Sequence, residues 1–228
     1  MTIFRFTLLK GLKSPLALVF NCILPIGMVF IRPLWADGAV LGYRLILMLM
    51  WGGAFLMSQG ILSDKVNGTI VRILAAPVTM LNYLTQSLIA FMMPLIVQIL
   101  LLSIVGAVLY NWDATFLFAL ALCYVIFTVS AVAMGFAWSC LFKDREQSSS
   151  IFLALITFGT ALSGAMFPLE LLPQPLQYVG AVLPAFWAVR GINALLDYGV
   201  VFDYWFALLI MLLLAIIFLF YGGKRKII

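Results

Sequence analysis

Long apolar segments separated by short polar turns constrain the fold of this chain more than any other feature. Residues 83–110, for example, contain no Asp, Glu, Lys or Arg over 28 positions, and about 20 predominantly apolar residues are enough for a transmembrane helix. Of the 228 residues, 66% are hydrophobic and 9% are charged, whereas a soluble domain has roughly 25% charged residues. The sequence therefore predicts an all-α, multi-pass membrane protein in which residues 1–228 form one transmembrane domain.

Six segments are predicted to span the membrane. Residues 1–13 have apolar and basic positions typical of a short helix at the cytosolic interface. Residues 167–198 contain four prolines and no uninterrupted apolar stretch of spanning length, so we expect two short helices in the outer leaflet, partly re-entrant against the bundle. The predicted spans are 16–31, 44–62, 83–110, 115–142, 148–166 and 202–221.

The distribution of basic residues predicts the orientation. Ten Lys and Arg residues fall in segments that this topology places in the cytosol, and three (Arg32, Arg44 and Arg190) fall outside. The excess follows the positive-inside rule, so both termini are predicted to be cytosolic. The basic residues are scattered among loops, which does not indicate a nucleic-acid partner.

Several kinds of chemistry are excluded by what the sequence lacks. It contains no histidine, so there is no HExxH zinc site and no Ser-His dyad. All eight acidic residues map to loops or span ends, which disfavours a carrier driven by protons or sodium. The three cysteines lie in apolar runs and form neither a disulfide framework nor a metal site. We predict no catalytic residue, no metal and no cofactor in this chain.

Four polar residues within or at the ends of the predicted spans are candidates for a solute pathway. Buried amides and hydroxyls usually hydrogen-bond between neighbouring helices, and that structural interpretation stays open for all of them. Gln98 is the preferred pathway residue because it follows Pro94, where a helix is expected to kink. The candidates are Asn21, Gln59, Gln98 and Ser163.

A polar interruption at 63–77 separates two apolar runs. Val66, Ile70, Ile73 and Leu74 recur at helical spacing, with Lys65, Thr69 and Arg72 on the opposite face, and Pro77 ends the pattern. This predicts a short amphipathic helix over 64–75 at the cytosolic surface, on which a soluble partner pushes. The alternative is an ordinary cytosolic loop that reverses the chain.

Two stretches resemble the permease subunits of type-2 ABC exporters. Residues 64–86, DKVNGTIVRILAAPVTMLNYLTQ, are similar to the family's acidic-Gly-Thr-x-x-x-Leu-x-x-x-Pro run after the second span. Residues 163–192, SGAMFPLELLPQPLQYVGAVLPAFWAVRGI, are similar to its SG-x-x-x-P-x-x-x-LP…P pattern before the last span. The order of six spans matches as well, so the resemblance covers nearly the whole chain.

The resemblance implies two permeases above two ATP-binding subunits, in the inner or plasma membrane of a bacterial cell. The second permease is another copy of this chain or a related one, and ATP and Mg²⁺ are held by the partner, because no GxxxxGK[ST] motif occurs here. The implied coupling residues are those of the 64–75 helix and the proline that follows it: Asp64, Lys65, Gly68, Thr69, Arg72 and Pro77. The implied second contact is Lys143, Asp144, Arg145 and Glu146, and the implied outer cap contains Pro168, Glu170, Pro173, Pro184 and Arg190.

The sequence thus favours a non-enzymatic permease of an ATP-driven exporter for amphipathic, lipid-linked or drug-like substrates. Two other classes stay open. A membrane scaffold or sensor recruits a soluble partner without moving a solute, and a secondary carrier depends on an ion gradient instead of ATP.

Overall fold

Most of the part of the chain that the structure describes is helical. A computed structural model describes residues 2–13, 15–35, 40–74, 80–167, 169–196 and 201–224; 88% of these are helical and none lies in a strand. The predicted all-α class is therefore confirmed for this part. The elements are α1 (Thr2–Leu12), α2 (Pro15–Leu18), η1 (Val19–Ile23), α3 (Leu24–Val29), η2 (Arg32–Leu34), α4 (Leu41–Val66), α5 (Thr69–Leu74), α6 (Met80–Tyr110), α7 (Ala114–Leu141), α8 (Arg145–Leu162), η3 (Leu169–Leu171), α9 (Gln174–Gly180), α10 (Pro184–Leu196) and α11 (Val201–Lys224).

Four described helices are long and apolar enough to cross a membrane. They are α4, α6 from Asn82, α7, and α11 to Gly223. Helices α9 and α10 pass the same test only as a pair, and they meet at an angle of 101°. The count is thus four, or five if the bent pair is one span, and the six-span topology stays a prediction.

The predicted first span, 16–31, is interrupted. Helix α2 runs directly into the π-helical turn η1, and α3 follows and ends at Val29. The apolar helix from Val19 to Val29 is shorter than a full span. Pro25 lies in the first turn of α3, and a proline removes one helical hydrogen bond. A local widening of the helix at η1 accommodates such a break.

The predicted fifth span, 148–166, is shifted towards the N-terminus. Helix α8 begins at Arg145 and ends at Leu162, and its first six residues, REQSSS, are polar. Gly164 has φ +79°, a conformation that glycine adopts readily and that commonly ends a helix. These two features leave α8 with a short apolar portion.

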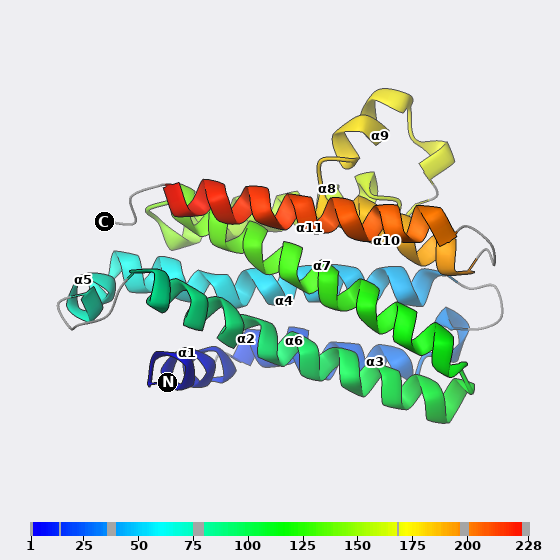
Figure 1. The fold of residues 1–228 in the computed structure, drawn as a ribbon, viewed down its shortest axis with the longest axis horizontal. Helices are drawn as coiled ribbons and strands as arrows, with labels where there is room; N and C mark the ends of the chain where they lie inside the picture. Colours follow the sequence, from blue (N-terminus) through cyan, green and yellow to red (C-terminus); the bar gives the residue numbers. More distant parts are fainter. Residues whose placement is uncertain are drawn as a thin grey trace.

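Residues 167–198 were expected to form two short helices in the outer leaflet. Figure 1 shows α9 projecting away from the bundle, while α10 lies along α7 and α11. Ala188, Val189 and Ile192 of α10 are fully buried. Helix α10 is therefore part of the packed bundle, and α9 is the element that stands apart.

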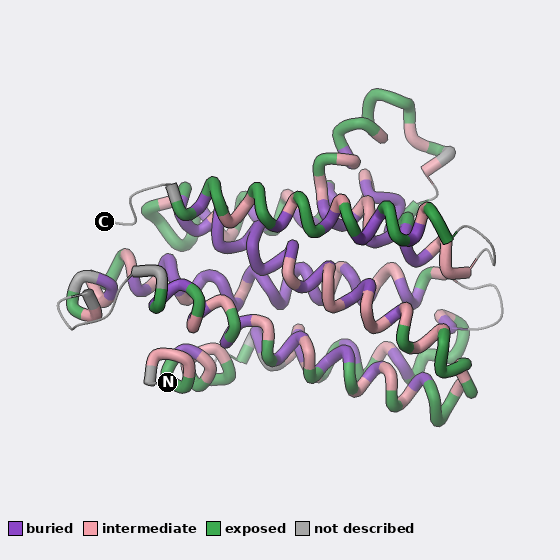
Figure 2. Tube along the Cα trace, in the orientation of Figure 1, coloured by how far each residue is buried: buried purple, intermediate pink, exposed green. Residues whose placement is uncertain are grey.

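Helices α4 and α7 form the centre of the bundle, since most of α4 and most of α7 from Cys123 onward are buried (Figure 2). Small residues bring them together: the Ser139 hydroxyl donates to the Ser58 carbonyl at 3.2 Å, and a Cβ at Gly135 would lie 2.7 Å from Ser58 Oγ. On the other side of α7, the Ser130 hydroxyl donates to the Met211 carbonyl of α11. Gly135 and Ser139 of α7 therefore lie at its contact with α4.

Acidic residues in the turns begin two of the helices. The Asp113 carboxylate accepts the backbone N–H of Thr115 at 2.9 Å before α7, and Asp144 accepts that of Glu146 at 2.9 Å before α8. Each satisfies a helix N–H that has no partner within its helix. The N–H of Thr115 also lowers the pKa of the Asp113 carboxyl below its ordinary value.

The polar ends of the helices gather in one place. Helix α1, helix α5, the turn between α7 and α8 and the last turn of α11 lie at the left end of the bundle in Figure 1. An aromatic cluster closes the opposite end, where Trp112 contacts Trp35, Tyr43 and Tyr110 at centroid distances of 5.2–5.6 Å. That the first of these ends faces the cytosol stays a prediction from the distribution of basic residues.

The aromatic cluster depends on the missing side chain of Gly106 in α6. A Cβ there would lie 2.2 Å from the Trp112 ring, which its aromatic neighbours hold in place. We expect Gly106→Ala to lower the free energy of unfolding by about 1–3 kcal/mol, the usual cost of overpacking. Thermal unfolding in detergent measures this, with Gly27→Ala as the control because a Cβ at Gly27 meets nothing within 4 Å. Equal melting temperatures for both variants would contradict the expectation.

Candidate functional site

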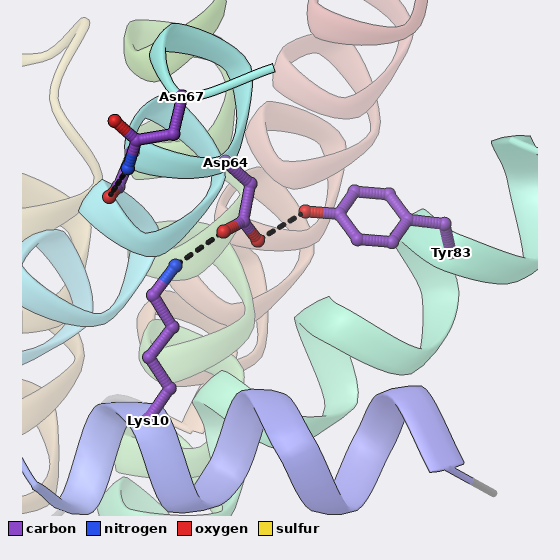
Figure 3. A network of polar contacts seen from close by, with 5 residues as sticks. Lys10, Asp64, Asn67 and Tyr83 are labelled. Atoms are coloured by element: carbon purple, nitrogen blue, oxygen red, sulfur yellow. Dashed lines mark hydrogen bonds and ion pairs between the residues drawn. The ribbon is translucent and has the colours of Figure 1, made fainter. Parts of the chain in front are cut away.

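A buried carboxylate joins three helices at the polar end of the bundle. Asp64, in the last turn of α4, is 6% exposed. Its Oδ1 forms an ion pair with Lys10 Nζ from α1, and its Oδ2 accepts a hydrogen bond of 2.9 Å from the Tyr83 hydroxyl of α6. Figure 3 shows the two side chains converging on the carboxylate from different helices. We name Lys10, Asp64 and Tyr83 the polar junction.

Helix α1 is attached to α6 at a second point. The backbone N–H of Phe4 donates to Gln86 Oε1 at 3.2 Å, and Gln86 Nε2 donates to Asn82 Oδ1 at 2.7 Å. Phe6 and Leu9 are exposed on α1, as an interfacial helix requires. The polar junction therefore fixes an amphipathic surface helix to the base of the two long helices α4 and α6.

The helix predicted over 64–75 is divided in the structure. Asp64 and Lys65 belong to α4, and a turn at Asn67 and Gly68 separates them from α5. Gly68 has φ +67°, and this left-handed conformation is the usual end of a helix. The Asn67 side-chain amide, labelled in Figure 3, donates to the Ser63 hydroxyl at 3.3 Å.

Because of this break, the single amphipathic face predicted for 64–75 does not exist. Val66 is exposed, Ile70 is buried and Arg72 is exposed. Thr69 begins α5. Pro77, the remaining predicted coupling residue, lies outside the described residues. The part of 64–75 that is separate from α4 is thus the short helix α5, joined to α4 by a two-residue turn.

The second predicted contact region lies at the same end. Lys143, Asp144, Arg145 and Glu146 are all exposed. Arg145 also lines a cavity of about 70 Å³ together with Lys10, Asp64 and Gln59. The structure therefore brings the two polar regions that the sequence singled out to the border of one cavity.

Two members of the polar junction were not among the predicted site residues. Lys10 was assigned to the polar side of an interfacial helix, and Tyr83 to the start of a span. One signal in the sequence pointed to a buried pair: Asp64 is the only acidic residue between Asp37 and Asp113. A carboxylate between two long apolar segments needs a cation or strong donors, but the sequence does not say which ones.

The four candidate pathway residues do not form one site. Gln59 Nε2 donates to Ser148 Oγ of α8 at 3.1 Å, and the Ser163 hydroxyl donates to the Thr160 carbonyl at 2.9 Å within the end of α8. The Gln59 bond joins two helices, as the structural interpretation expects, whereas the Ser163 bond lies within one helix. Asn21 and Gln98 are different, because they line one cavity together.

The predicted outer cap is distributed over three elements. Pro173 precedes α9, and Pro184 begins α10 and is buried. Arg190 Nη2 bonds Asp203 Oδ1 of α11 at 3.0 Å and lies 5.8 Å from the centre of the Trp187 ring. Pro168 and the side chain of Glu170 lie outside the described part of the structure.

Comparison with known proteins decides the family. A family model with the description "ABC-2 family transporter protein" matches residues 35–223, which is most of the chain and includes α4 to α10 entirely. The chain belongs to the ABC-2 transporter family. No curated protein matches it.

Membership of the ABC-2 family makes this chain a permease of an ABC transporter and a multi-pass membrane protein. Such a permease is a transport component that is not itself catalytic, and the family normally works with an ATP-binding subunit. The resemblance found in the sequence is thus confirmed. The matched region contains Asp64 and Tyr83, whereas Lys10 and the whole of α1 precede it.

The polar junction leads to a stability prediction. We expect Lys10→Met to lower the free energy of unfolding by about 1–3 kcal/mol, because it leaves the buried Asp64 carboxylate without its cation. Thermal unfolding of the purified permease measures this, and Lys13→Met, an exposed lysine at the end of the same helix, is the control.

A double variant separates pairing from a general effect of the substitution. Lys10→Met combined with Asp64→Leu removes both charges. The decrease in its free energy of unfolding should therefore be smaller than the sum of the decreases in the two single variants. Strict additivity would show that Lys10 and Asp64 do not stabilise each other.

Proposed function

We propose that this permease is the membrane-spanning subunit of an ATP-driven exporter. It moves an amphipathic, lipid-linked or drug-like substrate out of the cytosol, and a separate subunit binds ATP and Mg²⁺. It works as a pair, with a second copy or a related permease, in the inner or plasma membrane of a bacterial cell. The observation that carries the proposal is the position of two elements next to the polar junction. Thr69 and Ile73 of α5 line a cavity with Asp64 and Tyr83, and exposed Arg145 lines another with Lys10 and Asp64.

A partner that displaces α5 also displaces α4, because the connection between the two helices is short. Only Asn67 and Gly68 separate the two helices, and both are held by backbone bonds to the last turn of α4, at 3.0 Å to Ser63 and 3.1 Å to Lys65. Ile70, on the inner side of α5, is buried. A short helix attached in this way moves as a rigid body with the helix that it follows.

The polar junction extends that movement to neighbouring helices. Asp64 lies one turn before Gly68 and is bonded to both α1 and α6. On its other side, α4 packs closely on α7 through Ser58 and Gly135. Displacement of α4 is therefore transmitted to both sides of the bundle. A permease powered by a separate subunit needs such transmission to open its pathway on one side of the membrane or the other.

The exposed charges at this end suit a protein partner. Arg72 on α5 and residues 143–146, at the same end of the bundle in Figure 1, are exposed and carry both signs of charge. Complementary charges at the rim of an interface govern the association rate and the choice of partner. Substitution of these charged residues therefore tests whether the ATP-binding subunit docks at this end of the bundle.

The test is purification of the tagged chain from its native host in mild detergent. A subunit with Walker motifs that co-purifies in near equal amount supports the proposal. Recovery of the chain alone, or with a partner that lacks ATPase motifs, overturns it and favours a membrane scaffold. Transport that collapses with the proton gradient and ignores ATP overturns it in favour of a secondary carrier.

Charge reversal on α5 gives a residue-level prediction. We expect Arg72→Glu to lower recovery of the ATP-binding subunit and substrate-stimulated ATPase activity severalfold, because a rim charge would then repel its partner. The melting temperature of the permease should not change, because Arg72 is exposed. The matched control is Arg32→Glu, an exposed arginine in η2 at the opposite end of the bundle. If Arg72→Glu leaves recovery of the ATP-binding subunit and substrate-stimulated ATPase activity unchanged, α5 is not part of the docking surface.

A further inference from the structure

One narrow strip of α4 is open towards its polar end. Within residues 51–64 every residue is buried except Leu56, Gly60 and Ser63, which are half-buried. These three lie at positions i, i+4 and i+7, so they share one face of the helix. We call them the α4 strip. The strip forms one wall of the cavity of about 70 Å³ beside the polar junction.

The polarity of this cavity changes along α4. Leu56 lies well inside the candidate span Leu41–Val66, whereas Ser63 lies about 10 Å further along the helix at 1.5 Å per residue. Lys10 and Arg145 also line the cavity, and Lys10 is paired with the residue that follows Ser63. The cavity is therefore apolar towards the interior of the bundle and basic at its polar end. A phospholipid in the leaflet next to this end has the same polarity.

The two cations of the cavity are accessible to a bound molecule. The Lys10 side chain is 36% exposed although it reaches from α1 to Asp64 (Figure 3), and Arg145 is exposed. An ammonium group has three N–H donors, and the bond to Asp64 Oδ1 uses one of them. None of the described residues forms an ion pair or a hydrogen bond with the Arg145 side chain. Both side chains thus have donors available for an anion.

The charges around the cavity define the head group. Lys10 and Arg145 supply two positive charges, and Asp64 is the only acidic residue among the described residues that line the cavity. One positive charge is left, which a phosphodiester with a single negative charge balances. Both oxygens of Asp64 have partners, so a head group that also carries a cation finds no free carboxylate there. Basic pockets between membrane helices on the cytosolic side bind anionic head groups.

We propose that this cavity binds the phosphate of an anionic phospholipid from the leaflet next to the polar end of the bundle. Lys10 Nζ and the Arg145 guanidinium donate charge-assisted hydrogen bonds to the phosphate oxygens, and an acyl chain lies along Leu56 and Gly60. A water molecule requires about 10–15 Å³, so a cavity of about 70 Å³ has room for a phosphate group. The bound lipid connects α1 with the beginning of α8, and its binding does not depend on the proposed function.

The experiment measures lipid binding to the full-length permease, with whatever partner it retains. The protein is freed of native lipid in a mild detergent, and dioleoyl-phosphatidylglycerol or dioleoyl-phosphatidylcholine is added in increasing amounts. Native mass spectrometry gives the apparent dissociation constant of the first bound lipid. The two lipids share their acyl chains and their phosphate, but only phosphatidylcholine carries a cation. We expect phosphatidylglycerol to bind at least tenfold more tightly, and equal affinities would overturn the site.

A variant connects the binding to the guanidinium. Arg145→Gln should lower the affinity for phosphatidylglycerol about tenfold, because it removes a charge-assisted contact with the phosphate. The matched control is Lys143→Gln, which removes an exposed positive charge two residues earlier that does not line the cavity; it should bind the lipid like the wild type. Equal losses in both variants would show attraction by overall charge and no site.

A second variant tests the position of the acyl chain. A Cβ at Gly60 would meet only the Phe91 ring, at 3.5 Å, which is an ordinary contact. Gly60→Leu therefore places a side chain in the open strip, and we expect it to lower the affinity for phosphatidylglycerol about tenfold. The control is Gly27→Leu, at an exposed position where a Cβ meets nothing within 4 Å. Equal affinities in these two variants would overturn the α4 strip as the lipid site. Melting temperatures establish that each variant is folded.

Two further results distinguish other occupants of the cavity. Inorganic phosphate at millimolar concentration should not displace phosphatidylglycerol, because it makes no contact with the apolar part of the strip. Displacement would assign the cavity to a soluble anion and overturn the lipid. If Arg145→Gln loses the ATP-binding subunit and keeps the affinity of the wild type for phosphatidylglycerol, the guanidinium serves a protein interface, and the lipid site is overturned while the exporter stands.

Discussion

The close contact of α4 with α7 is the interaction on which the rest of the fold depends. In a membrane there is little hydrophobic drive to bring helices together, so close packing and interhelical hydrogen bonds must do so. Ser58, Gly135 and Ser139 supply both, since the Gly135 position has no room for a Cβ and the Ser139 hydroxyl reaches the Ser58 carbonyl. Helices α6, α10 and α11 then pack around this pair.

Because α4 is packed along its length, the position of its polar end is fixed. Asp64 is placed where α1 and α6 both reach it, and Gly68 turns the chain into α5 immediately afterwards. The pairing also joins a helix outside the family-matched region to one inside it. Helix α1 is thereby attached to the family-matched part of the permease.

The sequence predicted the long helices well because apolar length alone defines them: α7 spans 114–141 where 115–142 was expected. It failed where single residues change the backbone. Gly68 divides the expected 64–75 helix, Gly164 ends α8 early, and η1 interrupts the first span. The Lys10–Asp64 pair was also missed, because the two residues are 54 positions apart and nothing local in the sequence connects them.

The two polar regions of the bundle differ in a way that separates their roles. At the polar junction both carboxylate oxygens of Asp64 have partners, so the network holds helices together and the carboxylate has little capacity left for a ligand. At Asn21 and Gln98 three buried polar atoms have none among the described residues, so these amides do not join helices through those atoms. Fully satisfied buried networks rigidify a core, and partly satisfied ones destabilise it. The satisfied network at Asp64 lies next to α5, the helix at which we propose that the partner docks, so it holds together the helices that the partner would move.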